Sequence, residues 1–306
     1  MKRLLVACAA ALLIAAPAMA KTTIGVSMAL FDDNFLTLLR QAMADYAKTK
    51  PDLEIQFQDA EGDVGKQLSQ VQNFVAQGVS AIIVNLVDAA ATKGMTDAAH
   101  KAGIPLVYVN RQPDEKELPS KVVVVASDDL VAGRLQMTEL AKRMGDKGNV
   151  VIMLGDLANG ATRGRTAGVK EIIAKHPGIK IVEEQTANWE RGRAIDLMSN
   201  WIQKGDKIDA VASNNDEMAL GALIAMRQGG LSPKSVAVGG VDATPDGLAA
   251  IAKGDLAVTV FQNAKGQGQR AIDDALKLVQ GGTVETRDII PYELVTPQNY
   301  KEFLNR

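Results

Sequence analysis

The chain has 306 residues, of which 47% are hydrophobic, and it carries 34 basic against 36 acidic residues. This length and apolar content suffice for about two compact lobes. The slightly acidic balance argues against nucleic acid as a partner, because nucleic-acid binding favours a basic patch.

The first 20 residues have the pattern of a signal peptide. Two basic residues precede an apolar run over residues 4–16, and Pro17-Ala-Met-Ala20 supplies the small residues of a cleavage site. The run is too short to span a bilayer. We therefore predict cleavage after Ala20 and a periplasmic protein. A lipid-modified Cys8 is the alternative, but only four apolar residues precede it. Cleavage removes this single cysteine, so we expect no disulfide and no thiolate metal site.

Strand-like and helix-like segments alternate along the rest of the chain. The apolar runs are rich in Val and Ile, as expected where helices bury both faces of a parallel sheet. The sequence predicts strands at 22–28, 54–58, 81–86, 105–110, 150–154, 180–186, 210–213, 236–239 and 256–261. It predicts helices at 36–49, 64–77, 89–101, 162–175, 192–203, 218–228 and 245–252. This alternation predicts an α/β fold with doubly wound parallel sheets. A polar loop at 112–120 interrupts it.

An internal repeat relates the strand, helix and strand of residues 78–110 to those of residues 208–242. In both copies the strands stop at polar side chains, which include Asn110 in the first copy and Asn215 and Asp242 in the second. Ligands bind outside the carboxyl ends of strands in open α/β sheets. Two similar lobes that face each other would place Asn110 across a cleft from Asn215 and Asp242.

The chain resembles the type I periplasmic sugar-binding proteins, the ribose, galactose and inositol binders of ABC importers. The resemblance covers nearly all of the chain after residue 20, and it is carried by Asn110-Arg-Gln112, Arg163-Gly-Arg165, the run from Asn215 to Leu223 and the run from Gly240 to Gly247. It implies two similar lobes joined by a three-strand hinge. We expect residues 21–126 and 263–290 in the N-terminal lobe and residues 127–262 and 291–306 in the C-terminal lobe. The expected crossings lie near Ser127, Asn263 and Pro291.

The resemblance also implies a ligand site between the lobes, which would close on a sugar or polyol by hinge motion. The family's sugar contacts, carried over to this sequence, give the candidate set Phe31, Asp33, Phe35, Asn110, Arg111, Arg165, Trp189, Asn215, Asp242 and Gln262. Such carboxylate, guanidinium and amide groups satisfy hydroxyls as both donors and acceptors. We expect Arg111 and Arg165 to donate forked hydrogen bonds to neighbouring hydroxyls, and the aromatic rings to cover the C–H faces of the ligand.

Several of these residues have structural alternatives. Asp33 could cap the helix that follows it, and Trp189 could be a hydrophobic staple before a helix. Asp216 and Glu217 follow Asn215 and are expected to be first-turn acids of a helix. Arg163 is expected to be solvated or to support the site from outside.

Two departures from the family pattern bear on the ligand. Asn110 stands where the ribose and galactose binders usually carry Asp, and the first loop, residues 29–34, lacks the usual Asn-Pro. A single aromatic ring on each side suits a six-membered ring. The resemblance therefore favours myo-inositol, with ribose, galactose or another monosaccharide as the alternative. It implies an ABC permease as partner, a chemoreceptor as a further candidate partner, a monomer and no cofactor.

An exported α/β enzyme that acts on sugars is the alternative from another class. His100 and His176 lie more than 70 residues apart with no acidic pair at metal-ligand spacing, and no Gly-x-Ser-x-Gly elbow is present. The run Gly266-Gln-Gly-Gln-Arg-Ala271 matches Gly-x-Gly-x-x-Ala, but glycines that allow close helix packing explain it better. A sugar-responsive repressor would need a helix-turn-helix before the first strand, where this chain has its signal peptide. We therefore expect neither an enzyme nor a metal site.

Overall fold

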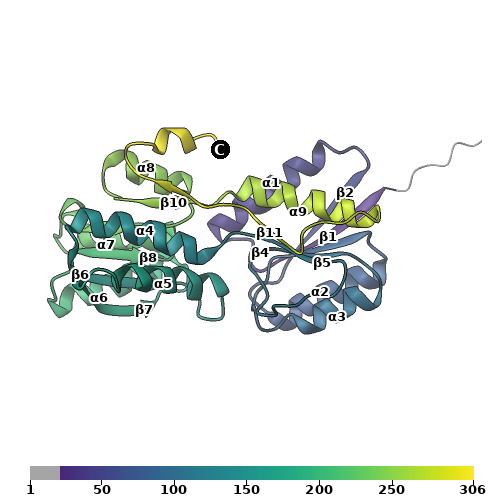
Figure 1. Ribbon diagram of the computed structural model, residues 1–306, viewed down its shortest axis with the longest axis horizontal. Coiled ribbons are helices and arrows are strands. Elements are labelled where there is room, and N and C mark those ends of the chain that lie inside the picture. The colour runs from purple at the N-terminus through teal and green to yellow at the C-terminus, as the bar shows by residue number, and fades with distance from the viewer. Residues whose placement is uncertain (1–20) are drawn as a thin grey trace, which may run out of the picture.

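The computed structural model describes residues 21–306, so the predicted signal peptide and its cleavage site lie outside the described residues. Two lobes lie side by side along the long axis of the molecule (Figure 1), and each is built around a parallel β-sheet. This arrangement confirms the predicted fold class.

The sheet of the N-terminal lobe has six strands, in the order β11-β5-β4-β3-β1-β2, and all its pairings are parallel. The strands are β1 (Thr22–Met28), β2 (Leu53–Asp59), β3 (Ala81–Val84), β4 (Leu106–Asn110), β5 (Val122–Ala126) and β11 (Arg287–Ile289). The C-terminal lobe has the parallel order β7-β6-β8-β9, with β6 (Lys147–Leu154), β7 (Gly178–Thr186), β8 (Ala210–Ser213) and β9 (Ala237–Gly239). Beside β9, β10 (Thr259–Phe261) pairs antiparallel with β12 (Glu293–Val295).

Helices cover both faces of each sheet. They are α1 (Asn34–Lys48), α2 (Val64–Gln77), α3 (Lys93–Lys101), α4 (Asp129–Met144), α5 (Gly160–Ile173), α6 (Arg191–Lys204), α7 (Asp216–Gln228), α8 (Pro245–Lys253) and α9 (Ala264–Val279). Two short 3-10 helices, Pro233–Ser235 and Tyr300–Phe303, complete the described elements. Successive residues of a strand point to opposite faces of the sheet. Ile83 packs with residues of α1 and α9, whereas Ile82 and Val84 pack with residues of α2 and α3. Burial on both faces explains the continuous apolar runs of the strands.

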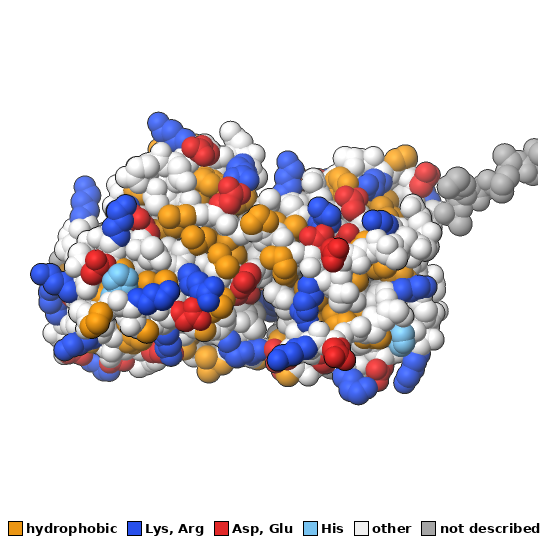
Figure 2. Space-filling view, in the orientation of Figure 1, with side chains coloured by type: hydrophobic (Ala, Val, Ile, Leu, Met, Phe, Trp, Pro, Cys, Tyr) orange, Lys and Arg blue, Asp and Glu red, His pale blue; other side chains and the backbone are white. Residues whose placement is uncertain are grey.

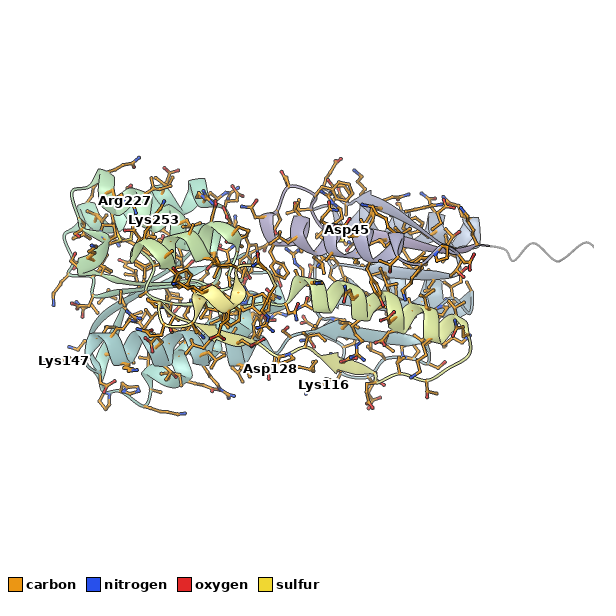
Figure 3. The ribbon with its side chains drawn as sticks, turned by 90° about the horizontal axis from the view of Figure 1, so that it is seen from above. Asp45, Lys116, Asp128, Lys147, Arg227 and Lys253 are labelled. Atoms are coloured by element: carbon orange, nitrogen blue, oxygen red, sulfur yellow. The ribbon has the colours of Figure 1, made fainter. Side chains whose placement is uncertain are left out.

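The chain passes between the two sheets three times, once between β5 and α4, once between β10 and α9, and once between β11 and β12. In Figure 3, Asp128, which caps α4 by accepting a hydrogen bond from the Leu130 N–H, lies at the waist between the lobes. Connections of this kind between two separately folded lobes permit hinge motion.

Several elements are absent from the predicted alternation, namely β5, α4, α9, β11 and β12. The four valines of β5 form a short apolar run whose periodicity cannot identify a strand. Helix α4 packs on α5 through Gly133, where a Cβ would overlap the backbone of Arg165. Its buried face also includes the polar Gln136, so the sequence shows no clear apolar period there. The prediction of packing glycines at 266–271 is confirmed at Gly268, where a Cβ would lie 3.0 Å from Met43 Cγ on α1.

Acidic and basic side chains are interspersed over both lobes on the face shown in Figure 2. Within residues 21–306, no helix is both long enough and apolar enough to cross a membrane. The same residues contain no group of three or more His, Cys, Asp or Glu side chains placed to hold a metal ion.

Candidate functional site

A cavity lies between the two lobes at the carboxyl ends of their strands. The N-terminal lobe contributes the start of α1 and the residues at the end of β4, and the C-terminal lobe contributes the start of α5 and the loops after β7, β8, β9 and β10. The lining residues are Asp33, Phe35, Leu36, Asn110, Arg111, Asn159, Ala161, Arg165, Trp189, Asn215, Asp242 and Gln262. The helix N-termini meet here because most helices begin directly after a strand.

Nine of the ten candidate residues predicted from the sequence line this cavity. Phe31 is not among them; its ring lies 3.9 Å from the guanidinium carbon of Arg40, so it packs on the surface of α1. Sequence reasoning missed Leu36, Asn159 and Ala161. The signal for Asn159 was its position before a helix, where its Oδ1 accepts a hydrogen bond from the Ala161 N–H at 3.0 Å.

A larger hollow of about 540 Å³ lies on the other side of Asp242 and Gln262, between α1, α8 and the C-terminal residues. Its walls are mostly apolar, with Leu38, Leu248 and Phe303 among them. The smaller cavity gathers the charged and amide groups of both lobes, so it is the better candidate for a polar ligand.

The side chain of Asn110 is fixed by two neighbours. Its Oδ1 accepts a hydrogen bond from Asn85 Nδ2 at 3.2 Å, and its Nδ2 donates to Gln267 Oε1 at 3.2 Å. Gln267 in turn donates to Ser127 Oγ at 2.9 Å. The backbone of Asn110 has φ +67°, a left-handed conformation that Asn tolerates better than most residues. The amide is therefore oriented by the N-terminal lobe itself.

Arg111 has few partners within the protein. Its Nη1 donates to Leu86 O at 2.9 Å, and within residues 21–306 no carboxylate lies within ion-pair distance of it. Burial lowers the pKa of Arg111, although Asp33 and Asp156 raise it in part. A guanidinium placed in a cleft with most of its N–H groups free is positioned to donate to a ligand.

Asp33 fulfils the capping role and also lines the cavity. Its Oδ1 accepts a hydrogen bond from the Leu36 N–H at 2.8 Å, which caps α1. Its Oδ2 has no hydrogen-bond partner among the described residues and is left as an acceptor. Asn215 also combines the two roles: its Oδ1 caps α7 by accepting from the Met218 N–H at 2.9 Å, its Nδ2 donates to Trp189 O at 3.3 Å, and the residue lines the cavity.

Arg165 is the centre of a buried network in the C-terminal lobe. Its five N–H groups meet five acceptors, at 2.7 to 3.4 Å, namely Asp129 Oδ1, Asn214 O, Asp242 Oδ1, Gln262 Oε1 and Tyr292 OH. Tyr292 also donates to Asp129 Oδ1 at 2.8 Å. With its donors used in this way, Arg165 does not fit the forked donation to ligand that the sequence predicted. It holds Asp242 and Gln262 at the cavity wall.

Trp189 combines backbone strain with an unused donor. It has φ +69°, which is unfavourable for an aromatic residue, and its ring lies so close to Gly155 that a Cβ there would overlap it. The indole Nε1 is buried without a hydrogen-bond partner within the described residues. Buried donors are almost always satisfied, and this one is left unused by the protein in a side chain that lines the cavity.

An ion pair links the lobes at the rim of the cavity. Arg163 of α5 donates to Asp114 Oδ1, in the loop after β4, at 2.5 Å, and both side chains are about half exposed. Arg163 therefore contacts the opposite lobe and is not simply solvated.

We predict that Arg163→Ala weakens ligand affinity by about two- to fivefold, because an exposed ion pair is worth roughly 0.2–1 kcal/mol and this one favours the closed arrangement of the lobes. Titration calorimetry at low and high salt concentration measures this loss of affinity, which should be smaller at high salt because salt screens exposed charges. The exchanged pair, Asp114→Arg with Arg163→Asp, should recover most of the loss. A loss that is unchanged by salt would contradict this explanation.

Behind the cavity wall, the carboxyl group of Asp216 is fully buried. Burial raises the pKa of Asp216 to about 7, although hydrogen bonds from Thr259 and Thr244 lower it in part and Glu217 adds to the rise. Burial likewise raises the pKa of Asp242 well above its usual range, and Arg165 offsets part of that shift.

We predict that the protein becomes less stable as the pH rises from about 4 to about 7. An unfolded aspartate has a pKa of about 3.9, so in this window folded Asp216 retains a proton that the unfolded chain has released. The stabilisation is complete below about pH 4 and is lost as the pH passes about 7, at up to about 1.4 kcal/mol per unit. Urea unfolding at each pH measures it. The free energy of unfolding should fall less steeply with pH in Asp216→Asn. An equal fall in the variant and the wild type would contradict the assignment of this pH dependence to Asp216.

Comparison with known proteins gives matches over nearly the whole chain. A family model described as a periplasmic binding protein domain matches residues 24–283. A protein of Rhizobium meliloti, provisionally assigned as a rhizopine-binding protein, is 51% identical over 306 residues, which cover 99% of each chain. The ribose import binding protein of Escherichia coli K12 is 30% identical over 285 residues, 93% of this chain and 94% of that protein.

Among solved structures, the fold is similar to that of an ABC transporter solute binding protein from Bacillus halodurans C-125 with bound myo-inositol. The TM-score is 0.88 and the sequence identity 42%, over 93% of this chain and 98% of that chain.

Proposed function

The chain belongs to the periplasmic binding protein family, and from this premise we propose that it captures a cyclic polyol, with myo-inositol as the first choice, between its two lobes. It is a solute-binding protein and not an enzyme, and it serves an ABC importer of sugars or polyols, as its relatives do. The finer assignments, namely the ligand, cleavage after Ala20, release into the periplasm and a monomeric state, are part of the proposal.

The observation that carries the proposal is the set of unused hydrogen-bonding groups in the cavity. Unused donors come from Arg111 and the Trp189 indole, and unused acceptors come from Asp33 Oδ2 and Asp242 Oδ2. A polyol ring presents hydroxyls that both donate and accept, so it can satisfy all of these groups. A purely anionic or cationic ligand would leave one kind unsatisfied.

The mechanism we propose is closure of the lobes around the ligand. Asp33, Asn110 and Arg111 belong to one lobe, whereas Trp189 and Asp242 belong to the other. A ligand that contacts both sets gains its full hydrogen bonding only when the lobes are together, so it favours the closed state. The closed surface is what an ABC permease would recognise, and a chemoreceptor is a further candidate partner.

The 42% identical structure with myo-inositol and the aromatic side chains of Phe35 and Trp189 on opposite walls favour a six-membered cyclitol. The ribose import protein at 30% identity supports the alternative, in which the ligand is ribose, galactose or another monosaccharide. Stereochemistry decides between them, because a site built on hydrogen bonds rejects a ligand that lacks one hydroxyl.

A thermal-shift screen tests the proposal. The full chain is expressed, purified after export and checked by mass for loss of residues 1–20, then heated with myo-inositol, its stereoisomers, ribose, galactose, glucose or xylose. A ligand at 100 times its Kd adds about 2.7 kcal/mol of stability, which raises Tm measurably. A rise with myo-inositol supports the cyclitol, a rise with an aldose alone supports the alternative, and no rise with any polyol contradicts the proposed function.

A further inference from the structure

The turn that carries Asp242 into the cavity has a strained backbone. In residues 241–244, here termed the Asp242 turn, Asp242 has φ +115° and Ala243 has φ +53°, although neither is glycine. Such conformations cost free energy and persist only where the surroundings enforce them.

The buried carboxylate of Asp216, the first residue of α7, receives hydrogen bonds from both sides of the turn. Its Oδ2 accepts from the Thr244 N–H at 2.8 Å and from Thr244 Oγ1 at 3.2 Å. Its Oδ1 accepts from Thr259 Oγ1 at 2.6 Å, and that hydroxyl oxygen accepts from the Ala243 N–H at 3.2 Å. The Asp216 N–H donates to Val241 O at 2.8 Å. One residue thus contacts the turn at three of its four positions, directly or through one hydroxyl.

The space around this carboxylate is closed. Asp216 has no solvent exposure, and a Cβ added at Gly240 or Gly247, on the two sides of the turn, would overlap its oxygens. Glycine at both positions allows the backbone to wrap around the side chain. A close-packed polar contact of this kind specifies one geometry.

The position of Asp216 also joins three separate parts of the cavity wall. It follows Asn215, it holds the Asp242 turn, and it bonds to Thr259 of β10, the strand that leads to Gln262. Asn215, Asp242 and Gln262 all line the cavity, whereas Asp216 does not. Its influence on a ligand therefore passes through these neighbours.

We propose that Asp216 is a positioning residue for ligand binding, which fixes the backbone of the Asp242 turn and so aims the Asp242 carboxylate into the cleft. The inference rests on the proposed function, because it requires a ligand that contacts Asp242. It goes beyond that function by assigning a role in affinity to a residue that touches no ligand.

The affinities of Asp216→Ala and Asp216→Asn for myo-inositol, or for the aldose that raises Tm in its place, test the inference. They are measured by calorimetry below the melting point of each variant. Asp216→Ala should bind about ten- to a hundredfold more weakly, the worth of one charge-assisted hydrogen bond. Asp216→Asn, which keeps an acceptor for the Thr244 N–H, should recover most of the affinity. In a protein that already carries Asp242→Asn, adding Asp216→Ala should lower the ligand affinity by less than about threefold, because the two residues act through one contact.

Two matched variants separate positioning from general loss of stability. Glu217→Ala removes the neighbouring acid, whose partner is Arg191 at 2.9 Å, and should bind normally. Leu223→Ala removes a buried side chain of the same helix and should lower Tm while keeping affinity within about threefold. Wild-type affinity in Asp216→Ala, or an equal loss in Leu223→Ala, would overturn the inference.

A second measurement needs no ligand, so it distinguishes failure of this inference from failure of the proposed function. Hydrogen exchange should show the Ala243 and Thr244 N–H groups protected in the wild type, exposed in Asp216→Ala and still protected in Leu223→Ala. Protection that survives in Asp216→Ala would refute the positioning role even if no polyol bound the wild type.

Discussion

Replacing Arg111 by alanine abolishes ligand binding and leaves the ligand-free protein nearly as stable as before. Within the protein this guanidinium makes one hydrogen bond, to Leu86 O, so its loss costs the fold about 1 kcal/mol. Arg111 lines the cavity, and its side chain has no other hydrogen-bond partner among the described residues. Two charge-assisted hydrogen bonds from it to ligand hydroxyls would be worth roughly 3–6 kcal/mol together. An affinity loss of at least a hundredfold is therefore expected, or about 2.8 kcal/mol at about 1.4 kcal/mol per tenfold.

Titration calorimetry with the ligand found in the screen measures the affinity, and a melt without ligand measures stability. Arg163→Ala is the matched control, because it removes an arginine from the rim of the same cleft and should lose at most about fivefold. Arg111→Lys keeps the charge but not the planar fork, so an intermediate affinity is expected. Near-normal binding by Arg111→Ala would show that the ligand does not contact this side of the cleft.

The strand ends could be predicted from the sequence because each one is local. Asn110, Asn215 and Asp242 each follow a short apolar run, and parallel strands bring such positions to the same edge of a sheet. The internal repeat places Asn110 opposite the other two, and the structure brings all three to one cavity. Their contact with a ligand stays a prediction.

The orientation of the side chains could not be predicted, because it depends on contacts between distant segments. The acceptors around Arg165 include Asp129 and Tyr292, which are 163 residues apart, so no local pattern indicates that its donors are used within the protein. Asp216 was expected to be a first-turn acid, and only the fold shows that its carboxylate turns inward, away from solvent. Phe31 shows the same limit, since a single residue separates it from Asp33 in the sequence but its ring packs against Arg40 and is not part of the cavity lining.

Replacing Arg165 by alanine abolishes binding as well, but for a different reason, and it also destabilises the ligand-free protein. The side chain is 6% exposed and offsets the charges of Asp129 and Asp242, which are themselves largely buried. Removing one partner of a buried ion pair costs about 3–5 kcal/mol, because the remaining charge has no compensation. Without this guanidinium, burial raises the pKa of Asp242 unopposed, so its carboxyl takes up a proton more readily.

Urea unfolding and calorimetry together distinguish Arg165 from Arg111. Arg165→Ala should lose stability and binding, whereas Arg111→Ala should lose binding alone. Adding Asp242→Asn to Arg165→Ala removes one of the uncompensated acids, so it should restore part of the stability and none of the affinity. Arg163→Ala, two residues earlier on α5, again serves as the control. If Arg165→Ala unfolded at the wild-type urea concentration, the five hydrogen bonds of Arg165 would not hold the wall of the cavity, and the contacts of Asp216 with the Asp242 turn would have to orient Asp242 without it.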